Sequence, residues 1–323
     1  MDIFKLTPKE GVILAAAQLQ ANATAKALSD ETGIAEHLVR YSLNKFEQAG
    51  LLNRRAMLNP SRIGLVPYAL FFSVTYETSS AEKLLAEILV SSALTAGVFE
   101  VGGDFQFGML LYAEEPFEVF DFVGRLADVK GVTLIEKSIG IRMSTTLLRR
   151  RYLGARPSAV EKITIERGPA VYAVDELDHR ILKGLTQTKH ESRRDLARLL
   201  NLPHTTLDTR VRKLEEAGVI AGYVYGMDIQ KLGLSTSRIL FSTKGSPQRI
   251  WEKVSEFGAR EHNVLQLARS LGSWDYELLV ETPTGREVVE ITRRLHDALG
   301  NAVLGVKTLP VYRYLKVNEY PLV

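Results

Sequence analysis

Apolar residues recur along this 323-residue chain at two spacings, and each change of spacing marks an expected element. In residues 174–184 and 203–218 they recur every three to four positions, which predicts amphipathic helices. A short helix is predicted between them, capped by Ser192 and ended by Asn201, a residue that tolerates left-handed backbone. The alternating residues 219–225 predict a strand pair. This order is typical of a helix-turn-helix followed by a wing.

The same pattern occurs a second time in the chain. Residues 45–52 (KFEQAGLL) align with residues 213–220 (KLEEAGVI) at an offset of 213 − 45 = 168. The offset continues upstream without a gap, pairing Leu14 with Leu182, and drifts slightly downstream, as loop insertions would cause. A similarity this long predicts a tandem duplication of one unit.

In each unit the winged helix is followed by a strand, a helix, two strands, a helix and a last strand. The two central strands meet at a glycine turn. This βαββαβ order is ferredoxin-like, and because that fold hosts many functions it identifies none of them. The main predicted elements are residues 68–76, 80–90, 107–112 and 116–127 in the first unit and 237–243, 247–257, 276–281 and 285–299 in the second.

We therefore predict an α+β chain in five segments. The stretch between the two units is basic, contains Gly154, Pro157 and Pro169, and lacks periodicity, which is typical of a linker. Its apolar Ile163 and Ile165 predict a short strand. The segments are a winged helix (1–66), a βαββαβ domain (67–148), the linker (149–172), a second winged helix (173–234) and a second βαββαβ domain (235–323).

Composition narrows the function classes. The hydrophobic fraction of 46% and the charged fraction of 24% are those of globular proteins. No apolar run reaches the ~18 residues that a membrane span needs, and the N-terminus carries no export signal, so we expect a cytoplasmic protein. The chain has no cysteine, and its six histidines lack the spacing of a helical metal pair. We therefore expect no metal and no cofactor.

The third predicted helix of each unit carries the candidate DNA-binding residues. In the second unit Leu207, Val211 and Leu214 face inward, which leaves short polar groups at the start of the outer face and cations further along. Such groups can reach base edges and phosphates, although a charged outer face is also typical of a merely solvated helix. The aligned first-unit helix has Ser42 and Asn44 in place of two arginines, so we expect it to bind phosphate weakly. The candidates are His204, Thr205, Thr206, Thr209, Arg210, Arg212 and Lys213, with Arg40, Tyr41 and Lys45 in the first unit.

Residues 175–182 (DELDHRIL), 210–220 (RVRKLEEAGVI) and 226–233 (GMDIQKLG) resemble, in order and spacing, the Lrp/AsnC family of bacterial and archaeal regulators. The resemblance covers most of the second half. One departure is Pro203, which stands where the family usually has a capping serine. The resemblance implies a transcription regulator that binds double-stranded DNA and whose βαββαβ domain dimerises and binds a small effector, usually an amino acid.

The resemblance also implies an effector site at the turn between the central strands. Gly272, Ser273, Trp274 and Asp275 match the family's Gly-x-aromatic-Asp turn. Backbone N–H groups beside a glycine can bind a carboxylate, and Asp275 can bind an ammonium group. The alternative is a purely structural turn with Trp274 at a subunit contact. In the first unit Gln106 replaces the aspartate, so we expect weaker binding there. The ligand domains can pair within the chain or across two chains, and we expect a homo-oligomer.

Two other function classes remain. Siroheme decarboxylases resemble Lrp/AsnC proteins and include fused two-unit forms, and their site is expected to offer His, Tyr and Arg to a tetrapyrrole. The central strands 105–112 and 274–280 contain no His or Arg, although Arg260 and His262 lie near. We therefore expect that the chain is not an enzyme. The third class is an effector-binding protein whose winged helices contact other proteins, and a gel shift with DNA separates it from a regulator.

Overall fold

The computed structural model describes residues 3–154, 158–187, 192–318 and 320. Among these residues no helix is long and apolar enough to cross a membrane. The first unit contains α1 (Pro8–Ala17), α2 (Ala25–Thr32), α3 (Glu36–Gln48), β1 (Leu52–Leu58), β2 (Val66–Tyr76), α4 (Ser79–Ser91), β3 (Thr95–Val101), β4 (Phe107–Ala113), α5 (Pro116–Ala127) and β5 (Val132–Leu148). The second contains α6 (Glu176–Gln187), α7 (Arg193–Leu199), α8 (His204–Glu216), β7 (Ile220–Met227), β8 (Ser235–Thr243), α9 (Pro247–Arg260), β9 (Val264–Gly272), β10 (Tyr276–Thr282), α10 (Gly285–Leu299) and β11 (Val303–Val317).

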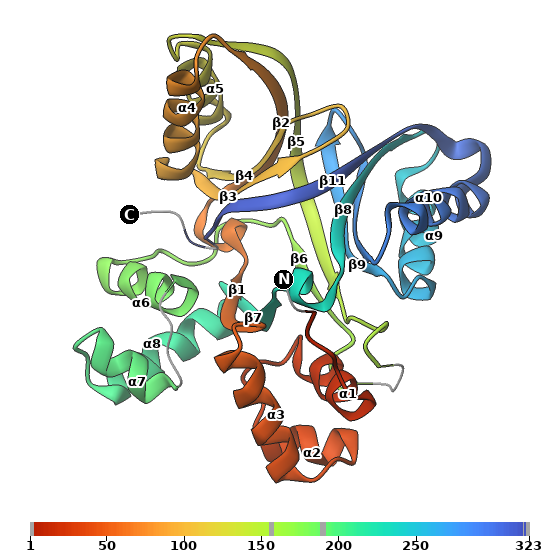
Figure 1. Cartoon of the computed structure of the whole chain (residues 1–323). Helices are drawn as coiled ribbons and strands as arrows, with labels where there is room; N and C mark the ends of the chain where they lie inside the picture. The colour runs from red at the N-terminus through yellow and green to blue at the C-terminus, as the bar shows by residue number, and fades with distance from the viewer. Residues whose placement is uncertain (1–2, 155–157, 188–191, 319, 321–323) are drawn as a thin grey trace.

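Both winged helices lie at the same end of the molecule (Figure 1). In the second, Ser192 caps α7 by accepting a hydrogen bond from the Asp195 N–H at 3.1 Å. Asn201 has a φ of 54°, the left-handed backbone expected of it. Leu207 and Val211 of α8 are fully buried in the three-helix core. The predicted cap and turn residues therefore form this domain as expected.

The strand after each third helix does not form a hairpin of its own. β1 of the first unit pairs antiparallel with β7 of the second, with Leu52 opposite Met227. The expectation of a strand pair within residues 219–225 is wrong, because that segment is one strand and the other unit supplies its partner. The resulting two-stranded ribbon, called here the β1–β7 ribbon, links the two winged helices.

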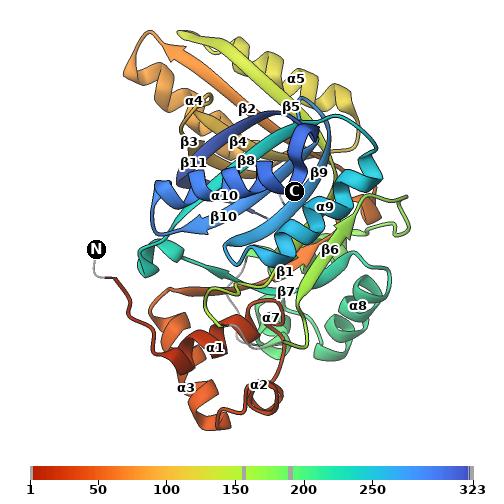
Figure 2. The same cartoon turned by 90° about the vertical axis from the view of Figure 1, so that its right-hand side faces the viewer.

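The two βαββαβ domains share one closed sheet. The strand order is β2-β4-β3-β11-β8-β10-β9-β5, and β2 also pairs with β5, so eight strands close into a barrel. The units meet along β3 with β11 and along β5 with β9. The helix pairs α4/α5 and α9/α10 pack on the outside of the barrel (Figure 2). An eight-stranded barrel has room inside for side chains or for one small ligand.

Side chains alternate between the two faces of the barrel wall. On β2, Leu70 and Phe72 pack outward with α4 and α5, whereas Phe71 points inward. Inside, Phe71 lies 5.4 Å from the Trp274 ring, and these aromatic side chains fill one end of the barrel. Burial on both faces explains why the sequences of β2 and β4 are almost continuously apolar.

The chain that leaves each last strand returns to the winged helix of its own unit. After β5, Leu153 packs against the core of the first winged helix. After β11, Tyr320 is buried in the core of the second. The strand expected at Ile163 and Ile165 is β6 (Lys162–Glu166), which pairs with β5. Pro157 of the predicted linker lies outside the described residues.

Candidate DNA interface and central cavity

Helix α8 presents a polar face to solvent. His204, Thr205 and Thr209 are exposed, and Thr206 is partly exposed. Nδ1 of His204 lies 3.0 Å from the Asp208 carboxylate, one helical turn away. Short polar side chains at the start of an exposed helix are the groups that a recognition helix offers to base edges.

Arg210 does not point away from the protein as its predicted role implies. Its Nη1 lies 2.6 Å from the Asp175 carboxylate and 3.3 Å from that of Asp178, which is buried at the start of α6. The hydrogen bond with Asp175 raises the pKa of the Arg210 guanidinium above its ordinary value. Arg210 therefore joins α8 to α6, and its contact with phosphate stays a prediction.

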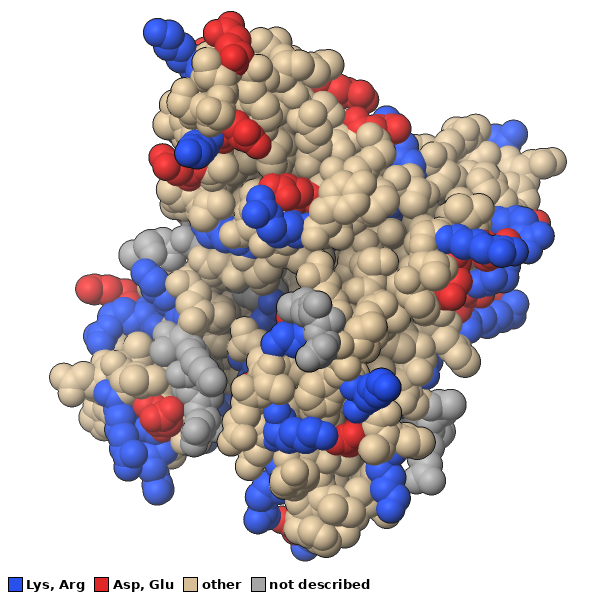
Figure 3. Space-filling view, viewed as in Figure 1, with Lys and Arg blue, Asp and Glu red and all other residues tan. Residues whose placement is uncertain are grey.

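Four cations of α7 and α8 face solvent. Arg194, Arg198, Arg212 and Lys213 are exposed, and Arg212 pairs only loosely with Glu216, at 4.0 Å. In Figure 3, Lys and Arg side chains stand out over the lower lobes, which are the two winged helices. This distribution suits a phosphate backbone.

The first-unit helix α3 has a different surface. Arg40 pairs with Glu36 on the helix surface, so the face begins with an acid where α8 has His204. Nζ of Lys45 lies 2.7 Å from the Glu10 carboxylate and 5.1 Å from the centre of the Phe4 ring. Tyr41 is 65% exposed and accessible to a partner. Among the three predicted residues of this helix, Lys45 is therefore committed to the domain's own packing.

The turn predicted to bind an effector packs against the first unit. A side chain at Gly272 would place its Cβ 2.4 Å from the Ile139 carbonyl oxygen, and the residue has a φ of 144°, so glycine is required. The Ser273 N–H donates to the same oxygen at 2.9 Å. Trp274 is 3% exposed inside the barrel. The turn thus helps to close the barrel between β9 and β5.

Asp275 and its counterpart Gln106 make the same contact in the two units. The Asp275 carboxylate accepts a hydrogen bond from the Thr243 N–H at 2.7 Å. The Gln106 side-chain oxygen accepts one from the Val74 N–H at 3.0 Å. Each side chain satisfies the end of a neighbouring strand, which supports the structural interpretation of the turn. Its role in effector binding stays a prediction.

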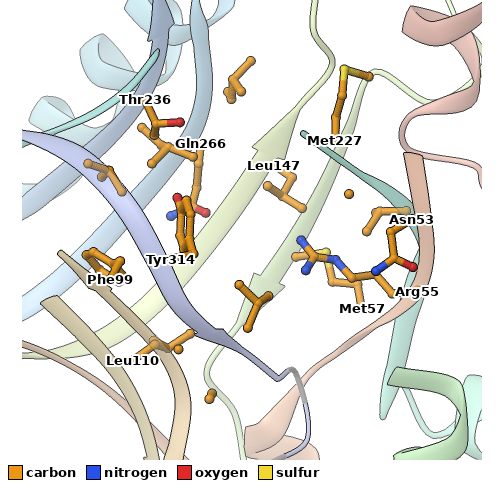
Figure 4. A pocket seen from close by; sticks show the side chains of 18 of the residues that line it. Asn53, Arg55, Met57, Phe99, Leu110, Leu147, Met227, Thr236, Gln266 and Tyr314 are labelled. Atoms are coloured by element: carbon orange, nitrogen blue, oxygen red, sulfur yellow. The ribbon is translucent and has the colours of Figure 1, made fainter. Parts of the chain in front are cut away.

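A cavity of about 680 Å³ lies between the open end of the barrel and the β1–β7 ribbon (Figure 4). Both units line it, with Arg55 and Met57 from β1, Met227 from β7 and Gln266 from β9. We call it the central cavity. The sequence did not predict it, because its walls come from strands that meet only when the barrel closes.

Charged side chains are buried in the wall of the central cavity. Nη2 of Arg142 lies 2.5 Å from the Glu277 carboxylate, and Arg238 contacts the other oxygen of that carboxylate. Burial by itself raises the pKa of Glu277, but the two guanidiniums outweigh it and hold the pKa below its ordinary value. A second pair joins Arg150 to Glu281 through two hydrogen bonds of 2.8 and 2.9 Å. The sequence signal that could have revealed these ion pairs was the presence of charged residues within otherwise apolar strands.

Comparison with known proteins agrees with this arrangement. Residues 174–221 match the winged helix-turn-helix DNA-binding family. The chain is 31% identical over 102 residues to an uncharacterised HTH-type transcriptional regulator of Pyrococcus furiosus, covering 32% of this chain and 68% of that protein. It is 26% identical over 153 residues to the HTH-type transcriptional regulator FL11 of Pyrococcus horikoshii, covering 46% of this chain and 97% of that one.

These relatives and the two-unit fold define the class: a DNA-binding, helix-turn-helix transcription regulator. The chain belongs to the family of HTH-type transcription regulators, with two units in tandem.

Solved structures share the fold over nearly the whole chain. The crystal structure of the siroheme decarboxylase NirDL has a TM-score of 0.58 and 13% identity, and the match covers 96% of this chain and 92% of that one. Our expectation that the chain is not an enzyme is contradicted by this comparison, since a protein with the same two-unit architecture is one. At this identity the likeness shows the fold alone.

Proposed function

We propose that this regulator acts in the cytoplasm, that it reads DNA mainly through α8, and that a small carboxylate effector controls it. The observation that carries the proposal is the difference between the two recognition helices. The exposed start of α8 is His204 and Thr205, with Arg212 and Lys213 further on, whereas α3 begins with the Arg40–Glu36 pair. Neutral polar groups at base edges and cations at phosphates favour binding, and an acid at the first turn opposes it.

The test is a selection of DNA sites from a random library, followed by affinity measurements on the selected site. The His204→Ala/Thr205→Ala double variant should lose the preference for that site. The aligned His37→Ala variant of α3 serves as the control and should keep it. If the double variant selects the same site as the wild type, α8 does not read the sequence. If the wild type neither enriches a site nor shifts DNA in a gel, the winged helices contact something other than DNA.

We propose an amino acid as the first effector to test, as the family resemblance implies. Calorimetry of the twenty amino acids identifies one that binds. Asp275→Asn then tests the turn, where the charged carboxylate that would hold the ammonium is replaced by a neutral amide. Unchanged affinity in this variant places the amino acid elsewhere in the chain.

We also propose that the chain forms a homo-oligomer, which light scattering after size exclusion measures.

A second candidate function is the decarboxylation of a tetrapyrrole. The size of the central cavity and its lining of arginines from both units favour it, since a tetrapyrrole is large and carries several carboxylates. Titration of the purified protein with siroheme, followed by absorbance and by mass spectrometry of the products, tests this function. Loss of carboxylate mass from siroheme supports it, and recovery of unchanged siroheme contradicts it.

A further inference from the structure

The charges in the wall of the central cavity do not balance. Arg142 of β5 and Arg238 of β8 share the single carboxylate of Glu277, and all three side chains are at least nine-tenths buried. Two guanidiniums and one carboxylate leave one positive charge. The next acid in the wall, Glu281, is already paired with Arg150. Buried charges in proteins are normally compensated, and the Phe99 ring, 4.3 Å from the Arg238 guanidinium, compensates this one only in part. The excess positive charge in a wall that faces a cavity therefore suits an anionic ligand.

Unused hydrogen-bond donors point to the same place. Nε of Arg142 and Nε of Arg238 are buried and have no hydrogen-bond partner among the described residues. The side-chain amide nitrogen of Gln266, which lines the same cavity, is also buried and has no hydrogen-bond partner among the described residues. A buried donor without an acceptor costs about 1–3 kcal/mol, so such groups are usually satisfied by something. All three are donors, and a carboxylate offers only acceptors.

The first unit has no copy of this cluster. The registers of β4 and β10 align Phe107 with Tyr276, an offset of 276 − 107 = 169. Glu277 therefore corresponds to Gly108, whose added Cβ would lie 2.1 Å from the Phe99 ring. Arg238 corresponds to Ala69 by the same offset. The cluster is thus a single feature of the chain, and a general need of the barrel does not explain it.

The rest of the cavity wall is mixed, with apolar side chains beside polar and charged ones. Met57, Leu110, Leu147 and Met227 surround the space in Figure 4. At about 680 Å³ the cavity is in the range of pockets that hold ligands well above amino-acid size. We propose that the Arg142–Glu277–Arg238 cluster binds the carboxylate of an organic acid whose apolar body lies in the central cavity. This site deepens the proposed function, because it assigns the effector's acid group to named side chains.

The test uses two matched probes, octanoate and octanol, which differ in the charge of one end. Each is titrated against a complex of the full chain with 8-anilinonaphthalene-1-sulfonate, a fluorescent dye with an apolar body and one negative charge. Octanoate should displace the dye with about tenfold or greater preference over octanol, the ratio expected of one charged hydrogen bond. Equal displacement by octanol overturns the assignment of a carboxylate.

Two variants should move the octanoate affinity in opposite directions. Arg142→Gln removes a positive charge and should weaken binding about tenfold or more, whereas Glu277→Gln removes the competing carboxylate and should tighten it. Arg294→Gln breaks an ion pair with Glu261 on the helical side of the barrel and should leave affinity unchanged. Arg142→Lys keeps the charge and is measured in place of Arg142→Gln if that variant does not fold. Shifts of less than twofold in both cluster variants overturn the proposal.

Further measurements identify the molecule that carries the acid, and they distinguish failure of this site from failure of the proposed function. Competition by the twenty amino acids and by uroporphyrin III shows whether a free amino acid or a tetrapyrrole carries the carboxylate, and failure of all of them and of octanoate overturns the site. DNA affinity is measured in parallel. Intact DNA binding with no octanoate effect overturns the anion site alone, and the reverse result overturns the proposed DNA function alone.

Discussion

The phenol ring of Tyr320 lies 5.8 Å from the imidazole ring of His179, centre to centre, and its hydroxyl is hydrogen-bonded to Nδ1 of that histidine. Tyr320 follows β11, which lines the central cavity, whereas His179 belongs to α6 of the second winged helix. The Gln187 side chain of α6 also donates a hydrogen bond to the Tyr320 carbonyl oxygen, at 2.6 Å. The wall of the cavity is therefore tied directly to the second DNA-binding domain.

Tyr320→Ala should destabilise the protein by about 3–5 kcal/mol, because it empties a fully buried aromatic position. Tyr320→Phe keeps the ring and loses one hydrogen bond, so its cost should be about 1 kcal/mol. Urea unfolding measures both. Tyr41→Ala, at an exposed position of α3, is the control and should change stability little. Equal losses in Tyr320→Ala and Tyr41→Ala would contradict the anchoring role.

Arg212→Ala/Lys213→Ala should flatten the salt dependence of DNA binding by about two units of log–log slope, because each residue is an exposed cation on α8. Arg210→Ala should leave that slope unchanged and lower the stability of the winged helix, since its guanidinium is bound to Asp175 and Asp178. Fluorescence anisotropy across a salt series measures the slope. If the salt slope changes by two units only when Arg210 is also replaced, Arg210 contacts phosphate as first predicted.

Base reading should depend on His204, Thr205 and Thr206, since they form the first turn of α8. Single alanine variants should each cost ~1–3 kcal/mol at one base position and leave nonspecific affinity nearly intact. Binding to a set of single-base variants of the selected site measures this. A uniform loss at all sequences would mean that these side chains only support the helix.

Glu277 should make stability depend on pH on the acid side. Its pKa in the folded chain is below the ordinary value, so the folded state binds its proton less readily than the unfolded chain. The stability that Glu277 contributes is therefore present at neutral pH and is lost as pH falls below the ordinary carboxyl range. Urea unfolding at several pH values should show a shallower acid-side loss in Glu277→Gln. An identical pH profile would count against the ion cluster.

Local pattern was enough to predict most individual elements. The helices expected at 116–127 and 285–299 are α5 and α10 with those bounds, because each has an apolar stripe and a cap at its start. Thr284, for example, accepts a hydrogen bond from the Glu287 N–H. The cap predictions of the second winged helix depended on equally local signals. Spacing along the chain specifies such features before any long-range contact forms.

Features that join the two units were not predictable in this way. The partner of β7 is β1, more than 160 residues away in sequence, and nothing in residues 219–225 specifies it. Arg210 has the spacing of an exposed residue, yet Asp175 and Asp178 draw it back to α6. The central cavity exists only where strands from both units converge. Each of these features depends on pairings between distant segments, and the sequence of either segment alone does not specify those pairings.

The β1–β7 ribbon joins the two winged helices of a single chain by backbone pairing. In a dimer of identical chains both helices carry the same side chains, so the preferred DNA site repeats itself on the opposite strand. Here α3 offers Tyr41 where α8 offers Thr209, and the two helices can change independently by mutation. We therefore expect the DNA site to be asymmetric, with two unlike half-sites and a defined orientation relative to the gene beside it.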